Sequence, residues 1–393
     1  MAQTLKFGNK VWAAKEDSVL AYNDINNNYK PLPFSFSRAS TGTRVNKDGL
    51  IETMGQDIAR IDYTDSADGV LLLEFSSTNL IPYSEDFENS DWTKNAGTTI
   101  TNNYAISPDG TLNASRFLGT GTSGLGDKFT LSATDNTISF WVKSNNGVNQ
   151  FCTLLGDSNQ RSEDLLVTTE WARISYTFTA SGLSDKTNGI FRDLNDNDID
   201  ILIYGAQLEQ NSYPSSYIAT SGSSVTRAAE TCNNSGNSEV FNDSEGVLFF
   251  DGSVFTTNES LCISVNDGGV TGSGNRVELL WFSDGNFYTQ VGNSGQEFIS
   301  SNTFYNKILI KYGSGSYDLY VNGFRRITDT FTSLTGLVSL DFKRQGSFTF
   351  KGKTKELGYY DTALTDAELE TLTSYRNWVS MVNELNLNII YNG

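Results

Sequence analysis

Strict alternation of apolar and polar side chains over short segments limits how this chain can fold more than any other feature. Residues 138–143 read Ile-Ser-Phe-Trp-Val-Lys, so the Ile, Phe and Val share one face of an extended strand while Trp141 lies on the other face. Residues 174–178 alternate in the same way, and the run 70–73 is apolar throughout, which indicates a strand buried on both faces. Short strands separated by Gly, Asn and Ser turns predict an all-β chain of β-sandwich or jelly-roll domains.

Local turn and cap signals support this reading. Asn322-Gly323 stands between two strand-like runs and supplies the positive φ angles that a tight hairpin turn needs. Thr365 and Glu368 form a capping-box pattern, which predicts a short C-terminal helix that starts at Asp366 and continues to about residue 378, or as far as about residue 385.

Charge and residue usage exclude several classes of function. The chain has a formal net charge of −18, which repels nucleic-acid phosphates, so we expect no nucleic-acid partner. No apolar run reaches the length of a signal peptide or a membrane span, so we expect neither secretory export nor membrane insertion. Cys152, Cys232 and Cys262 are an odd set without metal-ligand spacing, and we expect buried free thiols.

Histidine is absent from the sequence. Ser-His-Asp and Cys-His catalysis and His-ligated zinc are therefore excluded. Paired carboxylates remain available for glycosidase chemistry, but no spacing in the sequence identifies such a pair. We therefore expect that the chain is not an enzyme.

A chain of 393 residues exceeds one ordinary sandwich, so several domains are expected. We predict an N-terminal β-rich attachment module over 1–83, a first sandwich over 84–228, a second over 237–378, and a C-terminal tail over 379–393. The tail mixes apolar residues with Asn and either docks on a neighbouring subunit or packs back on its own chain.

A long pattern runs from Phe36 to Phe87. It reads FSRASTGTRVNKDGLIE, then RIDY, LLLE and TNLIPYSEDF. It resembles the N-terminal region of tail or fibre proteins of phages that infect Bacteroidetes-like hosts. The resemblance implies attachment to other virion proteins and a location on the phage particle.

Two further resemblances concern the sandwiches. Asp91-Trp-Thr93, Phe140-Trp-Val-Lys143 and Tyr204-Gly-Ala-Gln-Leu-Glu209 resemble carbohydrate-binding-module-like jelly rolls of phage tail proteins. The segments 319–323 (LYVNG) and 355–372 resemble the concanavalin A-like lectin or laminin-G sandwich. Both resemblances imply a fold, and neither by itself establishes that sugar is bound.

Exposed aromatic rings beside Arg and Asp are the usual means of holding a sugar. Trp141 lies on the polar face of its strand, and Trp281 and Tyr288 flank a turn that contains Asp284, with Arg276 nearby. These five residues are the candidates for carbohydrate binding. The alternative is that each ring belongs to a sandwich core.

An acidic cluster provides candidate metal ligands. Asp196, Asp198 and Asp200 alternate, so a strand would place their carboxylates on one side, where they could hold a structural calcium ion. The alternative is a solvated loop and a charged sheet edge that prevents mispairing. No other cofactor is expected.

Three functions remain open. The first is a virion surface or tail-associated protein that recognises a host-surface glycan during adsorption. The second is a purely structural collar, fibre or capsid-decoration protein without a ligand, and the third is a polysaccharide depolymerase. Several copies on one particle would raise the effective affinity of weak sites, so we expect a homo-oligomer, with a trimer as one arrangement.

Overall fold

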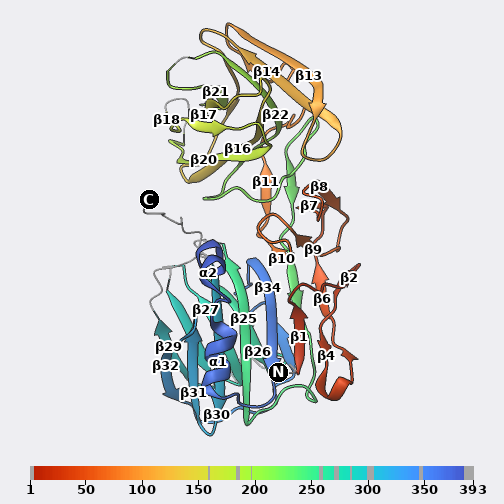
Figure 1. Cartoon of the computed structure of the whole chain (residues 1–393), viewed down its shortest axis with the longest axis vertical. Helices are drawn as coiled ribbons and strands as arrows, with labels where there is room; N and C mark the ends of the chain where they lie inside the picture. Colours follow the sequence, from red (N-terminus) through yellow and green to blue (C-terminus); the bar gives the residue numbers. More distant parts are fainter. Residues whose placement is uncertain are drawn as a thin grey trace. The chain divides into compact units, whose positions relative to one another are not determined.

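The computed structural model describes residues 4–157, 160–182, 186–195, 197–255, 260–269, 274–283, 286–298, 305–344 and 348–384. The chain forms two compact units. Unit 1 comprises Met1–Arg38, Gln56–Phe75 and Glu230–Gly393, and unit 2 comprises Ala39–Gly55 and Ser76–Ala229. All strand pairings described below are antiparallel, which confirms the predicted all-β class (Figure 1).

Unit 1 is a sandwich of two sheets. Sheet A has the order β32 (Phe324–Thr330), β31 (Ser316–Val321), β30 (Tyr305–Gly313), β25 (Glu245–Val254), β34 (Gly352–Tyr360), β1 (Leu5–Gly8), β4 (Tyr22–Asn23), β5 (Lys30–Pro31). In addition, β10 (Val70–Leu73) pairs with β34, and β9 (Arg60–Asp62) pairs with β10. Sheet B has the order β29 (Ser294–Phe298), β28 (Phe287–Val291), β27 (Arg276–Trp281), β26 (Leu261–Asn266), β33 (Ser339–Asp341). A small sheet contains β2 (Ala14–Lys15), β3 (Ser18–Val19), β6 (Phe34–Ser37) and β24 (Thr231–Asn233), and η1 (Ile25–Asn27) is a single 3₁₀ turn.

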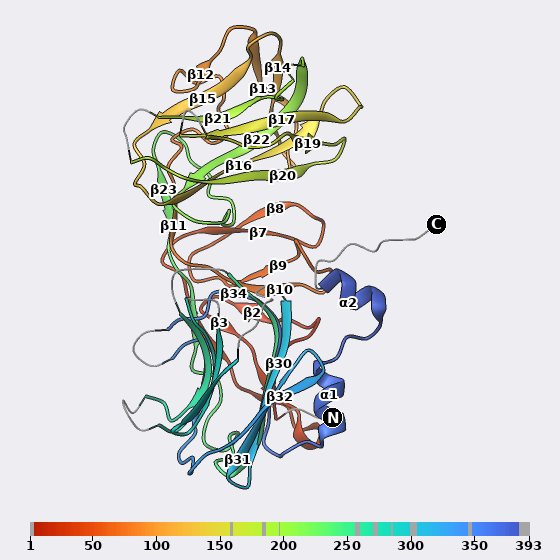
Figure 2. The ribbon, with the colours of Figure 1, turned by 90° about the vertical axis from the view of Figure 1, so that its left-hand side faces the viewer.

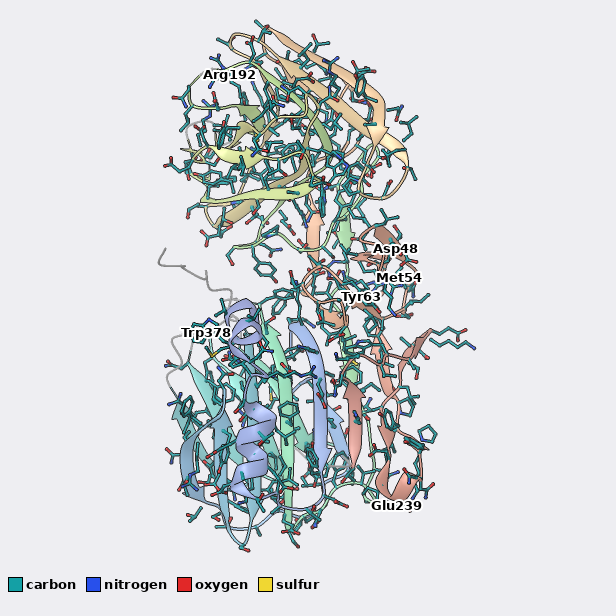
Figure 3. The ribbon with its side chains drawn as sticks, viewed as in Figure 1. Asp48, Met54, Tyr63, Arg192, Glu239 and Trp378 are labelled. Atoms are coloured by element: carbon teal, nitrogen blue, oxygen red, sulfur yellow. The ribbon has the colours of Figure 1, made fainter. Side chains whose placement is uncertain are left out.

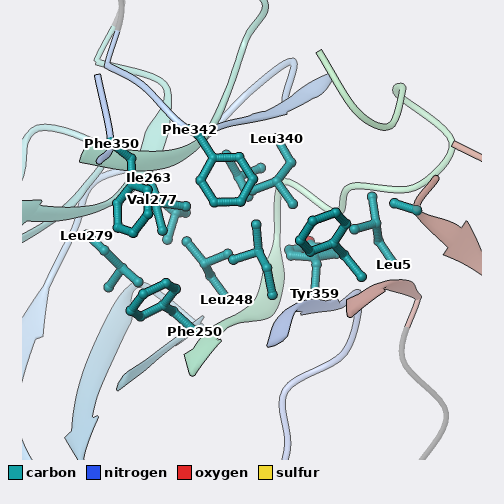
Figure 4. Close-up of a cluster of buried hydrophobic side chains, with 14 of the residues drawn as sticks. Leu5, Leu248, Phe250, Ile263, Val277, Leu279, Leu340, Phe342, Phe350 and Tyr359 are labelled. Carbon is teal, nitrogen blue, oxygen red and sulfur yellow. The ribbon is translucent and has the colours of Figure 1, made fainter. Parts of the chain in front are cut away.

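The core of unit 1 lies between the two sheets. Leu248 and Phe250 of β25 meet Ile263 of β26 and Leu279 of β27 (Figure 4). The alternation within each strand turns these side chains to one face, and their burial supplies the hydrophobic driving force for the sandwich.

Unit 2 is a second sandwich. Sheet C has the order β13 (Thr98–Ile106), β14 (Leu112–Gly119), β22 (Ile199–Glu209), β16 (Asp135–Ser144), β20 (Ala172–Thr179). Sheet D has the order β12 (Thr93–Lys94), β15 (Gly124–Phe129), β21 (Lys186–Arg192), β17 (Gln150–Gly156), β18 (Gln160–Arg161), with β19 (Leu165–Val167) also on β17. Two two-stranded sheets complete it. One is the hairpin of β7 (Gly42–Val45) and β8 (Ile51–Met54), and the other pairs β11 (Ser77–Asn79) with β23 (Val225–Arg227), which is distant in the chain.

Figure 3 locates the β7–β8 pair by Asp48 in its connecting loop and Met54 at the end of β8. Gly49 in that loop has φ +78°, a left-handed conformation that glycine adopts without strain. The core of unit 2 contains Ile138, Phe140 and Val142 of β16, as the alternation predicts.

The N-terminal segment does not form the separate module over 1–83 that the sequence led us to expect. β1 pairs with β34 through Leu5 and Tyr359, and β10 pairs with β34 through Leu71 and Thr354. The physical reason lies in β10, whose four apolar side chains are all buried and need cover on both faces. The C-terminal half of the chain supplies the neighbouring strand of sheet A.

The C-terminal helix starts where predicted but is shorter. α1 (Asp366–Thr373) begins with the capping box, in which the Glu368 carboxylate accepts the Thr365 amide hydrogen bond at 2.9 Å. The helix ends at Ser374, whose backbone is extended, and a second helix α2 (Trp378–Glu384) follows. Asn377 is the N-cap of α2, since its side-chain oxygen accepts a hydrogen bond from the Ser380 amide at 2.9 Å.

The helices lie on unit 1 (Figure 2). Leu369 of α1 packs with Val247 and Phe249 of β25 on the face of sheet A opposite the sandwich core. Trp378 at the start of α2 is 67% exposed (Figure 3). Within the described residues, no helix is long and apolar enough to cross a membrane, and residues 385–393 of the predicted tail lie outside the described ranges.

Candidate functional site

The first candidate site is the face of sheet C that points away from the core of unit 2. We call it the Trp141 face, and its residues are Trp141, Trp171, Arg173, Tyr204 and Tyr217. Trp141 on β16 pairs with Arg173 on β20 and with Tyr204 on β22, so the three side chains stand beside one another. Trp141 and Trp171 are half-buried, whereas Tyr204 and Tyr217 are buried beneath them.

Trp141 carries the strongest chemical signal on this face. Its indole Nε1 is buried and donates no hydrogen bond to any atom of the described residues. An indole N–H in a buried place normally has an acceptor, and a missing one costs about 1–3 kcal/mol. The Trp171 Nε1, by contrast, donates to the Ile106 carbonyl at 3.1 Å.

A bulge in β22 positions these rings. The pairing register between β16 and β22 shifts between Ser139 and Trp141, and Gly205 in β22 has φ +63°. A Cβ at Gly205 would approach Trp141 and Tyr217 to 3.2 Å. Glycine is therefore needed both for the backbone conformation and for the close approach of the two rings.

The tyrosines below the indoles are tied to carboxylates. The Tyr204 hydroxyl lies 3.1 Å from Glu85 and 3.0 Å from Asp109, and the Tyr217 hydroxyl donates to Glu85 at 2.9 Å. Burial, followed by the negative charges of Glu85 and Asp109, raises the pKa of Tyr204 far above its usual value. The phenol therefore stays neutral and acts as a hydrogen-bond donor that holds the floor of the face in place.

Gln207 and Glu209, at the end of the segment Tyr204–Glu209, have a structural role. Glu209 is buried and accepts hydrogen bonds from the Ser215 amide at 2.8 Å and from Gln207 at 2.7 Å. Gln207 in turn accepts one from the Ile218 amide at 2.7 Å. These bonds hold segment 210–220 against sheet C, which places Tyr217 below Trp141.

Arg173 supplies a cation at the rim. Its guanidinium donates to the Ser215 carbonyl at 2.6 Å and to the Ser139 hydroxyl at 3.0 Å. Ile106 and Leu112 add exposed apolar surface, since each is more than half exposed and the two are paired on β13 and β14. The Trp141 face thus combines flat rings, an unsatisfied donor and a fixed arginine, which is the chemistry that holds a sugar ring.

The second group of predicted residues is divided between the two faces of sheet B. Arg276 of β27 and Tyr288 of β28 point away from the core, because the core positions are Val277, Leu279 and Phe287. Trp281 points to the opposite side and contacts Phe250, Phe287 and Phe350 at ring distances of 5.2–5.8 Å.

Trp281 therefore does not join Arg276 and Tyr288 in one site. In the hairpin, Trp281 pairs with Phe287 and Leu280 pairs with Tyr288, so residues that flank the turn in sequence fall on opposite faces. Asp284 lies outside the described residues.

Of the acidic candidates, Asp198 and Asp200 lie within the described residues, and they do not form a metal site with other described acidic or thiol groups. Asp198 is exposed and precedes β22, while Asp200 makes a two-pronged ion pair with Arg116 at 2.8 Å for each contact and accepts from Asn145 at 2.9 Å. The hydrogen bonds from Arg116 lower the pKa of Asp200. Asp196 lies outside the described residues, and no group of three acidic or thiol side chains in the described ranges could hold a metal ion.

Sequence reasoning missed two important arginines. Arg173 was detectable in principle, because Trp171-Ala-Arg173 begins an alternating strand. Arg344, which lies beside Arg276, follows β33 and is far from it in sequence, so no local pattern could have placed it there.

The three cysteines are free and fully buried, as expected. Burial raises the pKa of the Cys152 thiol and of the other two well above the usual value. None of the three thiols is therefore poised as a nucleophile at neutral pH.

The sequence matches no protein-family profile and no curated protein. Among solved structures, the carbohydrate-binding CBM40 domain of the Ruminococcus gnavus IT-sialidase, bound to α2,3-sialyllactose, is similar at 18% identity and a TM-score of 0.30, covering 36% of this chain and 94% of that one. The tandem CBM22 domains of Xyn10C from Paenibacillus barcinonensis give 11% identity and a TM-score of 0.28, covering 75% of this chain and all of that one. A Trypanosoma rangeli sialidase mutant gives 8% identity and a TM-score of 0.29, covering 95% and 82%. The likeness is distant, and neither ligand nor activity passes from those proteins to this chain.

Proposed function

We propose that this chain is a non-catalytic glycan-binding protein of a phage particle and that the Trp141 face holds the glycan. One observation supports the proposal that this chain binds a glycan. The Trp141 Nε1 is buried and has no acceptor in the described residues, and it lies beside the Trp171 indole and the hydrogen-bonded Arg173 guanidinium. A sugar ring would contact the half-buried indole plane, and a sugar hydroxyl that displaces the side chains over the buried Nε1 would accept its hydrogen bond.

The assignment to a phage particle is supported by the pattern from Phe36 to Phe87. Its charged positions Arg38, Arg60 and Glu74 belong to a buried ion cluster in unit 1, so part of the pattern has a structural reason. We expect the protein in purified phage particles, detected by peptide mass spectrometry. Its absence from particles that otherwise infect normally would refute the assignment.

Binding is tested on a glycan array that includes neutral and acidic polysaccharides and surface polysaccharide extracted from Bacteroidetes cells. The Trp141→Phe variant keeps a flat ring but removes the N–H, so we expect a loss of affinity of about 2- to 13-fold for the ligand found, the equivalent of one hydrogen bond. Trp141→Ala removes ring and donor together and should weaken binding further. Trp378→Ala, on exposed α2, is the matched control and should bind as the native chain does.

Two outcomes would contradict the proposal. If Trp141→Ala binds as tightly as Trp378→Ala, the Trp141 face is not the site. If the native chain releases reducing ends from the bound polysaccharide, the protein is a depolymerase and the non-catalytic part of the proposal fails.

A further inference from the structure

We infer that unit 1 carries a second binding site, for a carboxylate-bearing saccharide, on the outer face of sheet B. We call it the arginine face, and its residues are Arg276, Glu278, Tyr288, Gln290 and Arg344. This site lies on another sheet of another unit and does not depend on the Trp141 face.

Strand alternation assembles the polar part of this face. Arg276 and Glu278 of β27 and Gln290 of β28 point away from the core, and Glu278 pairs directly with Gln290. Arg344 reaches the same place from the segment after β33, where its Nη2 donates to the Gln290 side-chain oxygen at 3.2 Å. Four polar side chains from three segments therefore meet on one surface.

Glu278 lies between the two arginines. Its Oε2 is 3.3 Å from the Arg276 Nε and 3.5 Å from the Arg344 Nε, yet it accepts no hydrogen bond of good geometry from the described residues. The Glu278 side chain is 1% exposed, and its burial raises its pKa, which the two arginines oppose. A nearly buried carboxylate thus orients two guanidinium groups without using all their donors.

The two arginines are the charged groups of this face that remain open to a ligand. Arg276 and Arg344 flank Glu278. The Asp341 carboxylate lies on the same face, but it is buried and accepts hydrogen bonds from the Asn266 side chain and the Asn234 amide. Arg276 and Arg344 keep 22% and 24% of their side chains exposed. Within the described residues, no acceptor pairs with the Nη atoms of Arg276 or with the Nη1 of Arg344. Guanidinium edges of this kind bind carboxylates through two parallel hydrogen bonds.

Aromatic rings border the arginines. The Phe282 ring lies 5.7 Å from Tyr288 and 6.4 Å from Phe348, and the Arg344 guanidinium lies 5.8 Å from the Phe348 ring centre. Tyr288 extends across Gly295, where a Cβ would come within 2.1 Å of its hydroxyl. Rings that contact an apolar sugar face, next to donors for an anionic group, select an acidic sugar over an inorganic anion.

The test is isothermal titration of the full chain with galacturonic acid trisaccharide, and with galactose trisaccharide as the neutral probe. We expect the acidic probe to bind more tightly and to weaken as NaCl is raised, because the contact is ionic. Arg344→Gln should weaken it by about tenfold or more, and Arg344→Lys, which keeps the charge but loses the planar fork, by less. Arg325→Gln is the matched control, since this exposed arginine pairs with Asp366 at the surface.

Three results would overturn the inference. One is equal affinity, or no affinity, for the two probes. Another is a properly folded Arg344→Gln variant that binds as Arg325→Gln does. The third is loss of acidic-probe binding in Trp141→Ala with retention in Arg344→Gln, which would move the site to unit 2. Failure of glycan binding at the Trp141 face leaves the result for the arginine face unaffected, so the two proposals fail separately.

Discussion

Replacing Arg60 by Met is expected to destabilise unit 1 strongly. Arg60 is fully buried and donates from Nε to Glu230 at 2.8 Å and from Nη2 to Glu74 at 2.8 Å. Arg38 donates to the same Glu230 at 2.7 Å, so two arginines and two glutamates form a buried quartet, and the buried Lys351 ammonium donates to the Glu230 carbonyl beside it. Burial lowers the pKa of Arg60, but the attraction of Glu230 and Glu74 outweighs it, so the pKa of Arg60 is raised and its charge is permanent.

The expected loss of stability in Arg60→Met follows from the buried charges that remain in the variant. Without Arg60, Arg38 alone faces Glu74 and Glu230, so the quartet loses one of its two buried positive charges and keeps both negative ones. Breaking a buried pair in this way costs about 3–5 kcal/mol. For a unit of this size each kcal/mol lowers Tm by about 2–4 °C, so the expected shift is about 6–20 °C.

The assay is hydrogen exchange in increasing urea, followed by mass spectrometry of peptides from β34 and, separately, from β22. Only the β34 peptides, in unit 1, should exchange at lower urea in Arg60→Met. The control Arg325→Met removes an exposed ion pair with Asp366 and should cost less than about 1 kcal/mol.

A double variant sharpens the test. Arg60→Met with Glu74→Met removes one charge of each sign and leaves the Arg38–Glu230 pair in place, so it should be more stable than Arg60→Met alone. The reasoning is refuted if Arg60→Met costs no more than Arg325→Met, or if the double variant is the least stable of the three.

Three further predictions concern local features. Gly323→Ala should cost about 1–2 kcal/mol in urea unfolding, because Gly323 has φ +86° and an added Cβ would meet the Ser374 hydroxyl at 2.8 Å; an unchanged midpoint would contradict this. The Thr365 amide lowers the pKa of Glu368, so the stability that this carboxylate contributes is present above its unfolded pKa and is lost as the pH falls through the lower folded pKa. The stability difference between the native chain and Glu368→Gln should therefore shrink between pH 7 and pH 3, and a constant difference would argue against the cap. A thiol reagent at neutral pH should label none of the three cysteines in the native protein and all three in urea.

Local sequence signals predicted local structure well in this protein. The alternation in 138–143 placed Trp141 on the solvent side of β16, the Asn322-Gly323 turn joins β31 to β32, and the capping box begins α1 at Asp366. Each signal acts over a few residues, because strand alternation, left-handed turns and helix caps depend on neighbours in the chain.

The sequence by itself therefore determined the all-β class, the Asn322-Gly323 turn, the buried thiols and, in β16, the face on which each residue lies. Only the tertiary structure decided that β1 and β10 join β34, that Glu230 completes the charges of Arg38, Arg60 and Glu74, and that Arg344 stands beside Glu278. These contacts join residues far apart in the chain, and strand pairing obeys no short-range rule that would name the partner. Trp281 and Tyr288 are close in the chain, and the hairpin register separates them. Trp281 pairs with Phe287, whereas a register one residue different would have placed Trp281 and Tyr288 on the same face.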